Sequence, residues 1–489
     1  MKQHLACGDG RIAAMGRSIL FAAFLVLCIE TVFSVPYRSF QLATHSGILS
    51  WTAGLLALAF LFAFGRTVFD FLVRHTHIPP APVGPWRTLW LVIGLLLRVL
   101  WAIVFRAPLK SDVLYYFNHA KSLVEQHSYA GAFWPPGYPF FLSPFLWLLG
   151  AHWWVVTVSS LILFVITYWV ACRFAERVGG ESGMRIAAVL VAIWPGYLTL
   201  AGVGAKELLV AALLPAALFA YLRATDNQTA NKSLLVFAGA LIGWATLAQP
   251  GILLFPVVFC VIEIVRGKPD RHSLLRVVLV VASMLLVVFP WAARNYVVYH
   301  RVVLVATNGG SVFYRSNNPK ANTNYIFEGE EKLPSDEFEA DKEGYRLGIL
   351  WIRNNPLAFL SLCVRKQVAY LGDDSLGFYE TLNRGLGIHR GYFLSKMIGN
   401  LFWLGLWSVM LCKARTLKRM AAQRIEFTYC AMPLLYQWGI DSVFESGPRH
   451  HVPYIVLIAV LMGAVLSPEI AAGNKEDAVA QLHEQVRQG

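Results

Sequence analysis

Twelve runs of mostly apolar residues, spread along nearly the whole chain, constrain its fold more than any other feature. A helix that spans a bilayer needs about 20 such residues. The candidate runs are 18–35, 50–73, 88–105, 153–172, 186–199, 208–223, 234–248, 251–265, 274–292, 396–412, 427–441 and 452–467. With 57% hydrophobic and only 15% charged residues, the composition excludes a soluble globular protein. We therefore predict an all-α polytopic membrane protein with about 12 transmembrane helices, interfacial helices and an outer loop subdomain of mixed structure.

The lysine and arginine residues indicate which side of the membrane each connection faces. They collect before the first run and in every second connection after it, as at Arg17, Arg177, Arg223 and Lys418. The positive-inside rule makes this side cytoplasmic, so we expect both termini in the cytoplasm. Anchoring to anionic lipid headgroups accounts for the net charge of +13, and no nucleic-acid partner is implied. The N-terminal run lacks a small-residue cleavage site, so we predict a retained anchor and not a signal peptide.

Changes in composition divide the chain into five predicted parts. They are an N-terminal transmembrane pair with a Pro-rich cytoplasmic link (1–87), a transmembrane core (88–293) with a first outer loop (106–152), an outer loop subdomain (294–395), C-terminal transmembrane helices (396–467) and a cytoplasmic tail (468–489). In the first outer loop, the apolar spacing from Asp112 to Gln126 predicts an amphipathic helix on the membrane surface. Tyr138 to Gly150 is expected to be interfacial or re-entrant. Leu347 to Leu371 is amphipathic, with a break at Asn354-Asn355-Pro356.

Asp112 is the first candidate for chemistry, because it lies just beyond the apolar run 88–105. A carboxylate there could act as a general base toward an acceptor hydroxyl, with Tyr115 and Tyr116 one turn later. The alternative is an N-cap for the surface helix, since Ser111 and Asp112 both suit that position. The two roles are compatible. The Trp134-Pro135-Pro136-Gly137-Tyr138-Pro139 segment that follows is typical of a structural hinge at the interface.

Two further groups of ionisable residues are expected at the outer membrane edge. Lys206 and Glu207 lie at an outer turn, where they are either functional or structural. The structural alternatives are a mutual ion pair and a lysine side chain that reaches the lipid headgroups. Arg294 ends a predicted span, where its guanidinium could bind phosphate oxygens or anchor the helix to lipid phosphate.

The last outer turn contains Arg449, His450 and His451. Two histidines without an obvious third ligand are weak evidence for a metal site, so Arg449 is the better candidate, as a phosphate or sugar contact. The seven cysteines show no metal-binding spacing. We predict no metal site and no cofactor, although a divalent metal is not excluded.

These candidates share one property. In the predicted topology Asp112, Glu207, Lys206, Arg294 and Arg449 all lie near the outer boundary of the membrane. An acid with several cations at one depth suits the attack of a hydroxyl on a sugar whose leaving group is a lipid phosphate, because fixed cations stabilise the developing negative charge.

Several short motifs occur in order between residues 88 and 467. They are Ser111-Asp112 with Tyr115 and Tyr116, Pro135-Pro136-Gly137-Tyr138-Pro139, Gly204-Ala205-Lys206-Glu207, Gly243 to Pro250, Pro290-Trp291 with Arg294, Asn317-Asn318-Pro319 and Pro448-Arg449-His450. In these motifs the chain resembles the C-type (GT-C) integral-membrane glycosyltransferases, in particular the bacterial branch related to protein O-mannosyltransferases and lipid A aminoarabinose transferases. The N-terminal transmembrane pair lies outside the resemblance.

The resemblance implies an inverting transfer from a polyprenyl-phosphate sugar outside the bacterial inner membrane. The acceptor would be an envelope glycan, the lipid A core or a protein. Asp112 matches the loop acid that serves as base, and Glu207 matches the acid of the second outer loop. The implied substrate-binding residues are Tyr115, Tyr116, Lys206, Arg294, Arg449 and His450.

Three departures from the family pattern matter. Val113 stands where many relatives have a second acid, Gln249 where they often have arginine, and Lys206 where a small polar residue is usual. The alternative function is a transporter or flippase of a lipid-linked sugar. A transporter would carry its ionisable residues near the middle of the bilayer, whereas these lie at the outer edge.

Overall fold

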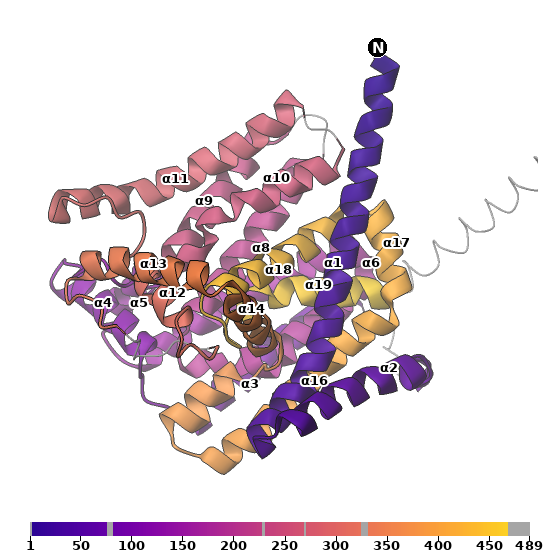
Figure 1. Cartoon of the computed structure of the whole chain (residues 1–489), viewed down its shortest axis with the longest axis horizontal. Helices are drawn as coiled ribbons and strands as arrows, with labels where there is room; N and C mark the ends of the chain where they lie inside the picture. The colour runs from indigo at the N-terminus through magenta and orange to yellow at the C-terminus, as the bar shows by residue number, and fades with distance from the viewer. Residues whose placement is uncertain (1, 76–81, 227–229, 268–269, 324–330, 468–489) are drawn as a thin grey trace, which may run out of the picture.

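The structure is a computed structural model that describes every residue except 1, 76–81, 227–229, 268–269, 324–330 and 468–489 (Figure 1). The predicted tail therefore lies outside the described residues. Helices and turns make up the described part of the chain, without a strand. The α-helices are α1 (Lys2–Thr44), α2 (Gly47–His75), α3 (Val83–Val104), α4 (Asp112–Glu125), α5 (Gly137–Leu149), α6 (Trp154–Ile193), α7 (Pro195–Leu198), α8 (Lys206–Ala224), α9 (Lys232–Ala248), α10 (Pro256–Val265), α11 (Arg271–Tyr299), α12 (Gly309–Ser316), α13 (Glu337–Asn354), α14 (Pro356–Leu371), α15 (Leu376–Phe378), α16 (His389–Cys412), α17 (Ala414–Gln423), α18 (Ile425–Val443) and α19 (Ile455–Leu466). Short helical turns are η1 (Thr199–Gly202), η2 (Pro250–Leu254), η3 (Tyr379–Gly385) and η4 (Val452–Tyr454).

The all-α polytopic architecture predicted from the sequence is confirmed. In the described residues, 7 helices are long and apolar enough to cross a membrane, or up to 8 if the bent pair α13–α14 counts as one span. They lie in α1, α2, α3, α6, α8, α11 and α16. Shorter apolar helices are Gly137–Leu149, Lys232–Ala248, Pro250–Val265 and Val452–Leu466. This count is lower than twelve because several predicted runs form helices too short to span alone, and because two runs, 153–172 and 186–199, share α6.

The two halves of α6 run in opposite directions. The backbone turns at Gly180, whose φ of 66° and ψ of −161° suit glycine and break the helix. As residue numbers rise along α3, the residues that it contacts in the first half of α6 fall in number, whereas those in the second half rise. The pairs are Arg87 with Tyr168 and Arg98 with Phe164 in the first half, and Trp86 with Arg185 and Arg98 with Val191 in the second. The two apolar runs in α6 therefore form two antiparallel helical segments joined by a tight turn at Gly180.

The basic connections lie together at one face of the helical bundle. Contacts between them are Arg17 with the Ala422 carbonyl at 2.7 Å, Arg177 with Asp226 at 2.9 Å, Arg266 with Tyr429 at 2.8 Å and Arg424 with the Val178 carbonyl at 2.9 Å. From this face α8 leads across to Lys206, and its 19 residues span about 28 Å. That length is close to the thickness of the hydrocarbon core. Lys206 and the groups beside it therefore lie at the opposite face.

Several helices gather at this opposite face, which we call the outer face after the topology predicted from the sequence. α4, α5, α12 and α13 lie together on the left of Figure 1, whereas α17 lies on the right. α4 occupies the range predicted for the amphipathic surface helix. α13 and α14 meet at the predicted break, with an angle of 110° between them. In the outer segment expected to be of mixed structure, the described residues form helices joined by turns and irregular loops, without a strand.

A buried arginine supports the backbone that leads to Lys206. Arg98 in α3 is 2% exposed and donates to the carbonyls of Ala192 at 2.9 Å and Val191 at 3.2 Å. These carbonyls end α6, where Pro195 cannot supply an N–H to continue the hydrogen-bond pattern. Arg98 thus satisfies the end of α6, and the chain proceeds through α7 and η1 into α8.

Candidate active site

Asp112 begins α4 at the outer face, but its side chain does not cap the helix. Ser111 holds the N-cap position with φ 54° and ψ −139°, a strained combination for a residue other than glycine. No side-chain capping hydrogen bond is formed there. The Ser111 hydroxyl instead donates to Asp112 Oδ1 at 3.2 Å. The carboxylate is therefore available for contacts away from its own helix.

Arg449 is the main partner of Asp112. It lies between α18 and η4, 337 residues further along the chain, and donates from Nη1 to Asp112 Oδ2 at 3.1 Å. Its Nη2 donates to both oxygens of Glu445 at 3.0 Å. Its Nε donates to His450 Nε2 at 3.3 Å. All three guanidinium nitrogens are thus engaged by neighbouring side chains.

The surrounding cations control the charge of Asp112. Burial alone would raise the pKa of this carboxyl, but Arg449 and then Lys206 lower it, and the net shift is downward. The neighbouring carboxylates in turn raise the pKa of the Arg449 guanidinium. Glu445 contributes most and Asp112 adds to it, whereas burial lowers this pKa. Asp112 is therefore ionised at neutral pH.

Lys206 is the cation of the site that is not already neutralised. Its ammonium lies 5.9 Å from the centre of the Tyr116 ring. In the part of the chain that the structure describes, no carboxylate lies within ion-pairing distance of it, so the expected alternative, an ion pair with Glu207, is not formed. Glu207, at the same end of α8, is 6% exposed, and its charge raises the pKa of Arg449. A partly buried ammonium without a carboxylate partner is suited to an anionic ligand.

Aromatic side chains form one wall of this region. Tyr115, which is 52% exposed, stacks on Trp134 with ring centres 4.9 Å apart. Tyr116 is buried and meets the edges of Trp134 at 5.6 Å and Tyr138 at 5.9 Å. The predicted hinge segment 134–139 therefore packs directly against the start of α4.

Arg294 is the one predicted site residue that the structure does not bring to this cluster. It donates from Nη1 to the Gly131 carbonyl at 3.3 Å and from Nη2 to the Tyr129 carbonyl. Its guanidinium also lies over the ring of Trp291, 4.9 Å from the centre. These contacts fasten the chain after α4 to the outer end of α11, which is an anchoring role.

Sequence reasoning missed four charged residues near the site. Glu445 clamps Arg449, and Asp441 bonds to His450 Nδ1 at 2.6 Å. Glu380 pairs with Arg384 at 2.8 Å. Burial raises the pKa of Glu380, although Arg384 lowers it. The four-residue spacing of Asp441, Glu445 and Arg449 was a usable signal. Nothing in the sequence linked Glu380 and Arg384 to Asp112.

The adjacent histidines do not act together. His450 faces Asp441, whereas His451 bonds through Nε2 to Asp374 at 2.9 Å. In the described residues, no group of three or more His, Cys, Asp or Glu side chains is arranged to hold a metal ion.

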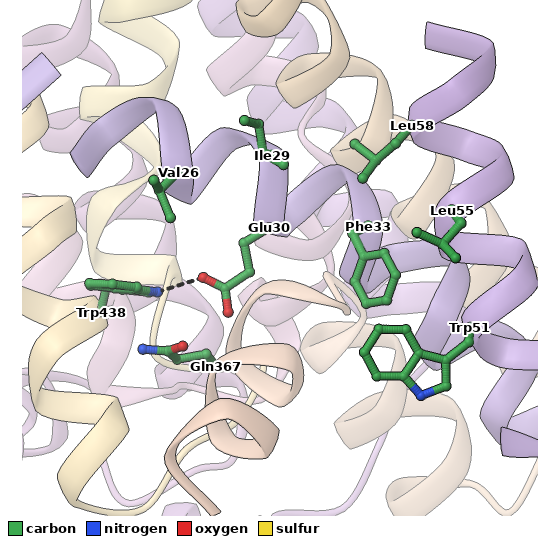
Figure 2. A pocket seen from close by; sticks show the side chains of 9 residues that line it. All are labelled: Val26, Ile29, Glu30, Phe33, Trp51, Leu55, Leu58, Gln367 and Trp438. Atoms are coloured by element: carbon green, nitrogen blue, oxygen red, sulfur yellow. Dashed lines mark hydrogen bonds between the residues drawn. The ribbon is translucent and has the colours of Figure 1, made fainter. Parts of the chain in front are cut away.

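Figure 2 shows an open groove of about 450 Å³. It is lined by residues of α1, α2, α14 and α18, namely Val26, Ile29, Glu30, Phe33, Trp51, Leu55, Leu58, Gln367 and Trp438. Trp438 Nε1 donates to Glu30 at 2.9 Å. None of the predicted site residues lines this groove.

Comparisons with known proteins bear on the family and the fold of the chain. Residues 134–293 match the model of a family described as Dolichyl-phosphate-mannose-protein mannosyltransferase. This segment includes Lys206 and Glu207 but neither Asp112 nor Arg449. The chain resembles the GT-C glycosyltransferases. No curated protein matches it.

Solved structures show the same fold at low identity. The Archaeoglobus fulgidus oligosaccharyltransferase in the apo form gives a TM-score of 0.51 at 13% identity over 81% of this chain and 52% of that protein. Its complex with Zn and sulfate gives 0.50 at 14% identity over 80% and 50%. The chain thus spans about half the length of that protein. ArnT from Cupriavidus metallidurans, bound to undecaprenyl phosphate, gives 0.42 at 14% identity over 80% and 78%.

Proposed function

We propose that this protein is a glycosyltransferase that moves a sugar from a polyprenyl-phosphate donor to a hydroxyl acceptor, with Asp112 as general base. The observation that carries the proposal is the half-buried Asp112 carboxylate at the outer face, held by Arg449 at 3.1 Å with Lys206 nearby. The family matched by residues 134–293 is described by a dolichyl-phosphate-linked mannose donor, which supports a polyprenyl-phosphate sugar as the donor class.

In the proposed reaction, the acceptor hydroxyl gives its proton to Asp112 while its oxygen bonds to the anomeric carbon of the sugar. The bond between that carbon and the phosphate oxygen breaks, and the polyprenyl phosphate leaves with the electron pair. Attack from the side opposite the leaving group inverts the anomeric centre. A base that is ionised at neutral pH and near the acceptor accelerates such a step by roughly 10²–10⁴-fold.

Lys206 is the group best suited to the departing phosphate. Negative charge grows on the phosphate as the bond breaks, and a fixed cation stabilises that transition state. Arg449 is less available, because its terminal nitrogens already bond to Asp112 and Glu445. We therefore assign Lys206 to the phosphate and Arg449 to the carboxylate.

We further propose that the protein lies in a bacterial inner membrane with its basic face, and both termini, in the cytoplasm. The donor and acceptor would then meet on the periplasmic side. The acceptor is an envelope glycan, the lipid A core or a secreted protein.

The test is sugar transfer in proteoliposomes supplied with radiolabelled undecaprenyl-phosphate sugars and an envelope extract as acceptor. The native protein should transfer label, and Asp112→Asn should reduce transfer on the order of 10²-fold or more at equal folded yield. Asn keeps the size of the side chain but cannot take the proton.

Asp336→Asn is the matched control, because Asp336 caps outer helix α13 and makes no contact with the cluster. It should retain native transfer. Equal transfer by the native protein and Asp112→Asn would reject Asp112 as the base and leave Glu207 as the next candidate. No transfer from any donor, with movement of the lipid-linked sugar across the bilayer, would favour a flippase instead.

A further inference from the structure

A chain of hydrogen bonds leads from the buried interior to Arg449. Tyr454 donates to Gln437 Oε1 at 2.8 Å, and Gln437 Nε2 donates to Asp441 Oδ1 at 2.8 Å. The same carboxylate oxygen lies 2.6 Å from His450 Nδ1. Asp441 is 1% exposed, so these bonds are shielded from water.

The partners of His450 determine which of its nitrogens carries a proton. Arg449 Nε is a donor without accepting ability, and it points at His450 Nε2 at 3.3 Å. Nε2 must therefore present its lone pair. In the neutral ring the proton then lies on Nδ1, where it is donated to Asp441.

This arrangement fixes the direction of the Arg449 guanidinium. Arg449 donates a hydrogen bond from Nε to His450 and from Nη2 to Glu445, so that Nη1 is directed at Asp112, to which it also donates. We infer that Asp441 and His450 are positioning residues for the reaction: they orient Arg449 so that it holds the Asp112 carboxylate toward the acceptor. This inference rests on the proposed function of Asp112. In this inference both residues act through Arg449.

The next residue in the chain offers a matched comparison. His451 forms a buried pair with Asp374 at 2.9 Å, which resembles the pair of His450 with Asp441. The Asp374 carboxylate is held on its other oxygen by Trp194 at 2.8 Å and has no link to Arg449. A change at His451 thus removes a similar buried pair without releasing Arg449.

The experiment measures kcat and the donor KM in the proteoliposome assay, with rates expressed per folded protein. Asp441→Leu and His450→Leu remove the two links, and Asp441→Asn keeps an oxygen in the place of Oδ1. His451→Leu is the control. A misplaced catalytic group costs on the order of tenfold to 10²-fold, so we expect kcat of Asp441→Leu and His450→Leu to fall by that amount. Donor KM should stay within about twofold, because uniform binding is unchanged.

Two further results are expected from a positioning role. Asp441→Asn should lie closer to the native kcat than Asp441→Leu, since the amide oxygen still accepts from His450. The double variant with Leu at both positions should be no slower than His450→Leu alone, because the two residues act in series. His451→Leu should retain the native kcat.

A native kcat for Asp441→Leu, a rise in donor KM without loss of kcat, or additive effects in the double variant would overturn the inference. These outcomes are distinct from failure of the proposed function. If Asp112→Asn is inactive while Asp441→Leu is native, only the positioning role fails. If Asp112→Asn is native, the base assignment itself fails.

Discussion

At the scale of single residues, two cations lower the pKa of Asp112 and so keep its carboxyl ionised. Arg449 is hydrogen-bonded to Glu445 and His450, whereas Lys206 lies over the Tyr116 ring and forms no ion pair with a carboxylate in the described part of the chain. Lys206 can therefore be removed without releasing the rest of the cluster. A variant without Lys206 therefore tests the electrostatic effect of this cation on Asp112 while the geometry of the Asp112–Arg449 pair is kept.

We predict that Lys206→Gln moves the acid limb of the kcat/KM profile to higher pH. Lys206 lowers the pKa of Asp112, so its loss raises that pKa and leaves the carboxyl protonated, and unable to act as base, over a wider acid range. Loss of a charge that stabilises the leaving phosphate should also reduce kcat on the order of 10²-fold on the alkaline side of this limb. The measurement is the initial rate of transfer as a function of pH.

Lys121→Gln serves as the control, because Lys121 lies on the exposed side of α4 and pairs with Glu125 at 3.8 Å. Its pH profile should match that of the native protein, and Lys206→Arg should restore the native limb. An unchanged limb in Lys206→Gln would mean that Lys206 does not act on the base.

The sequence indicated individual candidate residues but not the partners of their side chains. Asp112, Lys206 and Arg449 were candidates because the predicted topology places them at the outer membrane edge, and His450 was a candidate through the family resemblance. The ion pair between Asp112 and Arg449 could not be predicted, since the two are separated by 337 positions and pairing depends on how the helices pack. The anchoring contacts of Arg294 depend on the same packing.

At the scale of helices, the contact between α6 and α19 depends on small residues. A Cβ added to Gly463 would lie 2.3 Å from the Gly183 carbonyl oxygen, and one added to Gly179 would lie 2.8 Å from the Ala464 Cα. In a membrane, helices associate through such close packing because lipid offers little hydrophobic drive for their contact. α19 is buried along nearly its whole length.

We predict that Gly463→Ala destabilises the protein by about 1–3 kcal/mol, because the added methyl group forces the two backbones apart. Gly439→Ala in α18 is the matched control, since nothing lies within 4 Å of its added Cβ. That change should be neutral or stabilise by roughly 0.5–1 kcal/mol through helix propensity. The midpoint of thermal unfolding in detergent checks both, and equal midpoints would contradict the close crossing.

Helix positions followed from the sequence where a local signal existed. The amphipathic spacing located α4, and Pro356 located the bend between α13 and α14. Asn308-Gly309-Gly310 is a typical turn sequence, but Asn308 precedes α12 and the two glycines form the first turn of this helix. There the glycines permit a close approach to α13, since a Cβ on Gly310 would lie 1.7 Å from the Asp341 carbonyl oxygen. Local turn propensity gave way to tertiary packing.

At the scale of the whole molecule, charge separates the two faces of the bundle. The basic connections contact one another at one face, and the cluster around Asp112 lies at the other, beyond the length of α8. The placement of lysine and arginine in every second connection was enough to predict this separation, because successive connections lie at opposite faces of the bundle. Which face meets the cytoplasm decides where the donor must be presented.

We predict that a cysteine at position 301 is accessible from outside the cell and that a cysteine at position 223 is not. Arg301 and Arg223 are a matched pair, with side chains 60% and 59% exposed, and each pairs only loosely with an acid at 3.5 and 3.8 Å. Arg301 follows the outer end of α11, and Arg223 lies in the last turn of α8 at the basic face. In a background with the seven native cysteines replaced by alanine, a membrane-impermeant maleimide should label Arg301→Cys in intact cells. It should label Arg223→Cys only after permeabilisation. The reverse pattern would place Asp112 and Lys206 in the cytoplasm, and the sugar donor would then have to be used from the leaflet on that side.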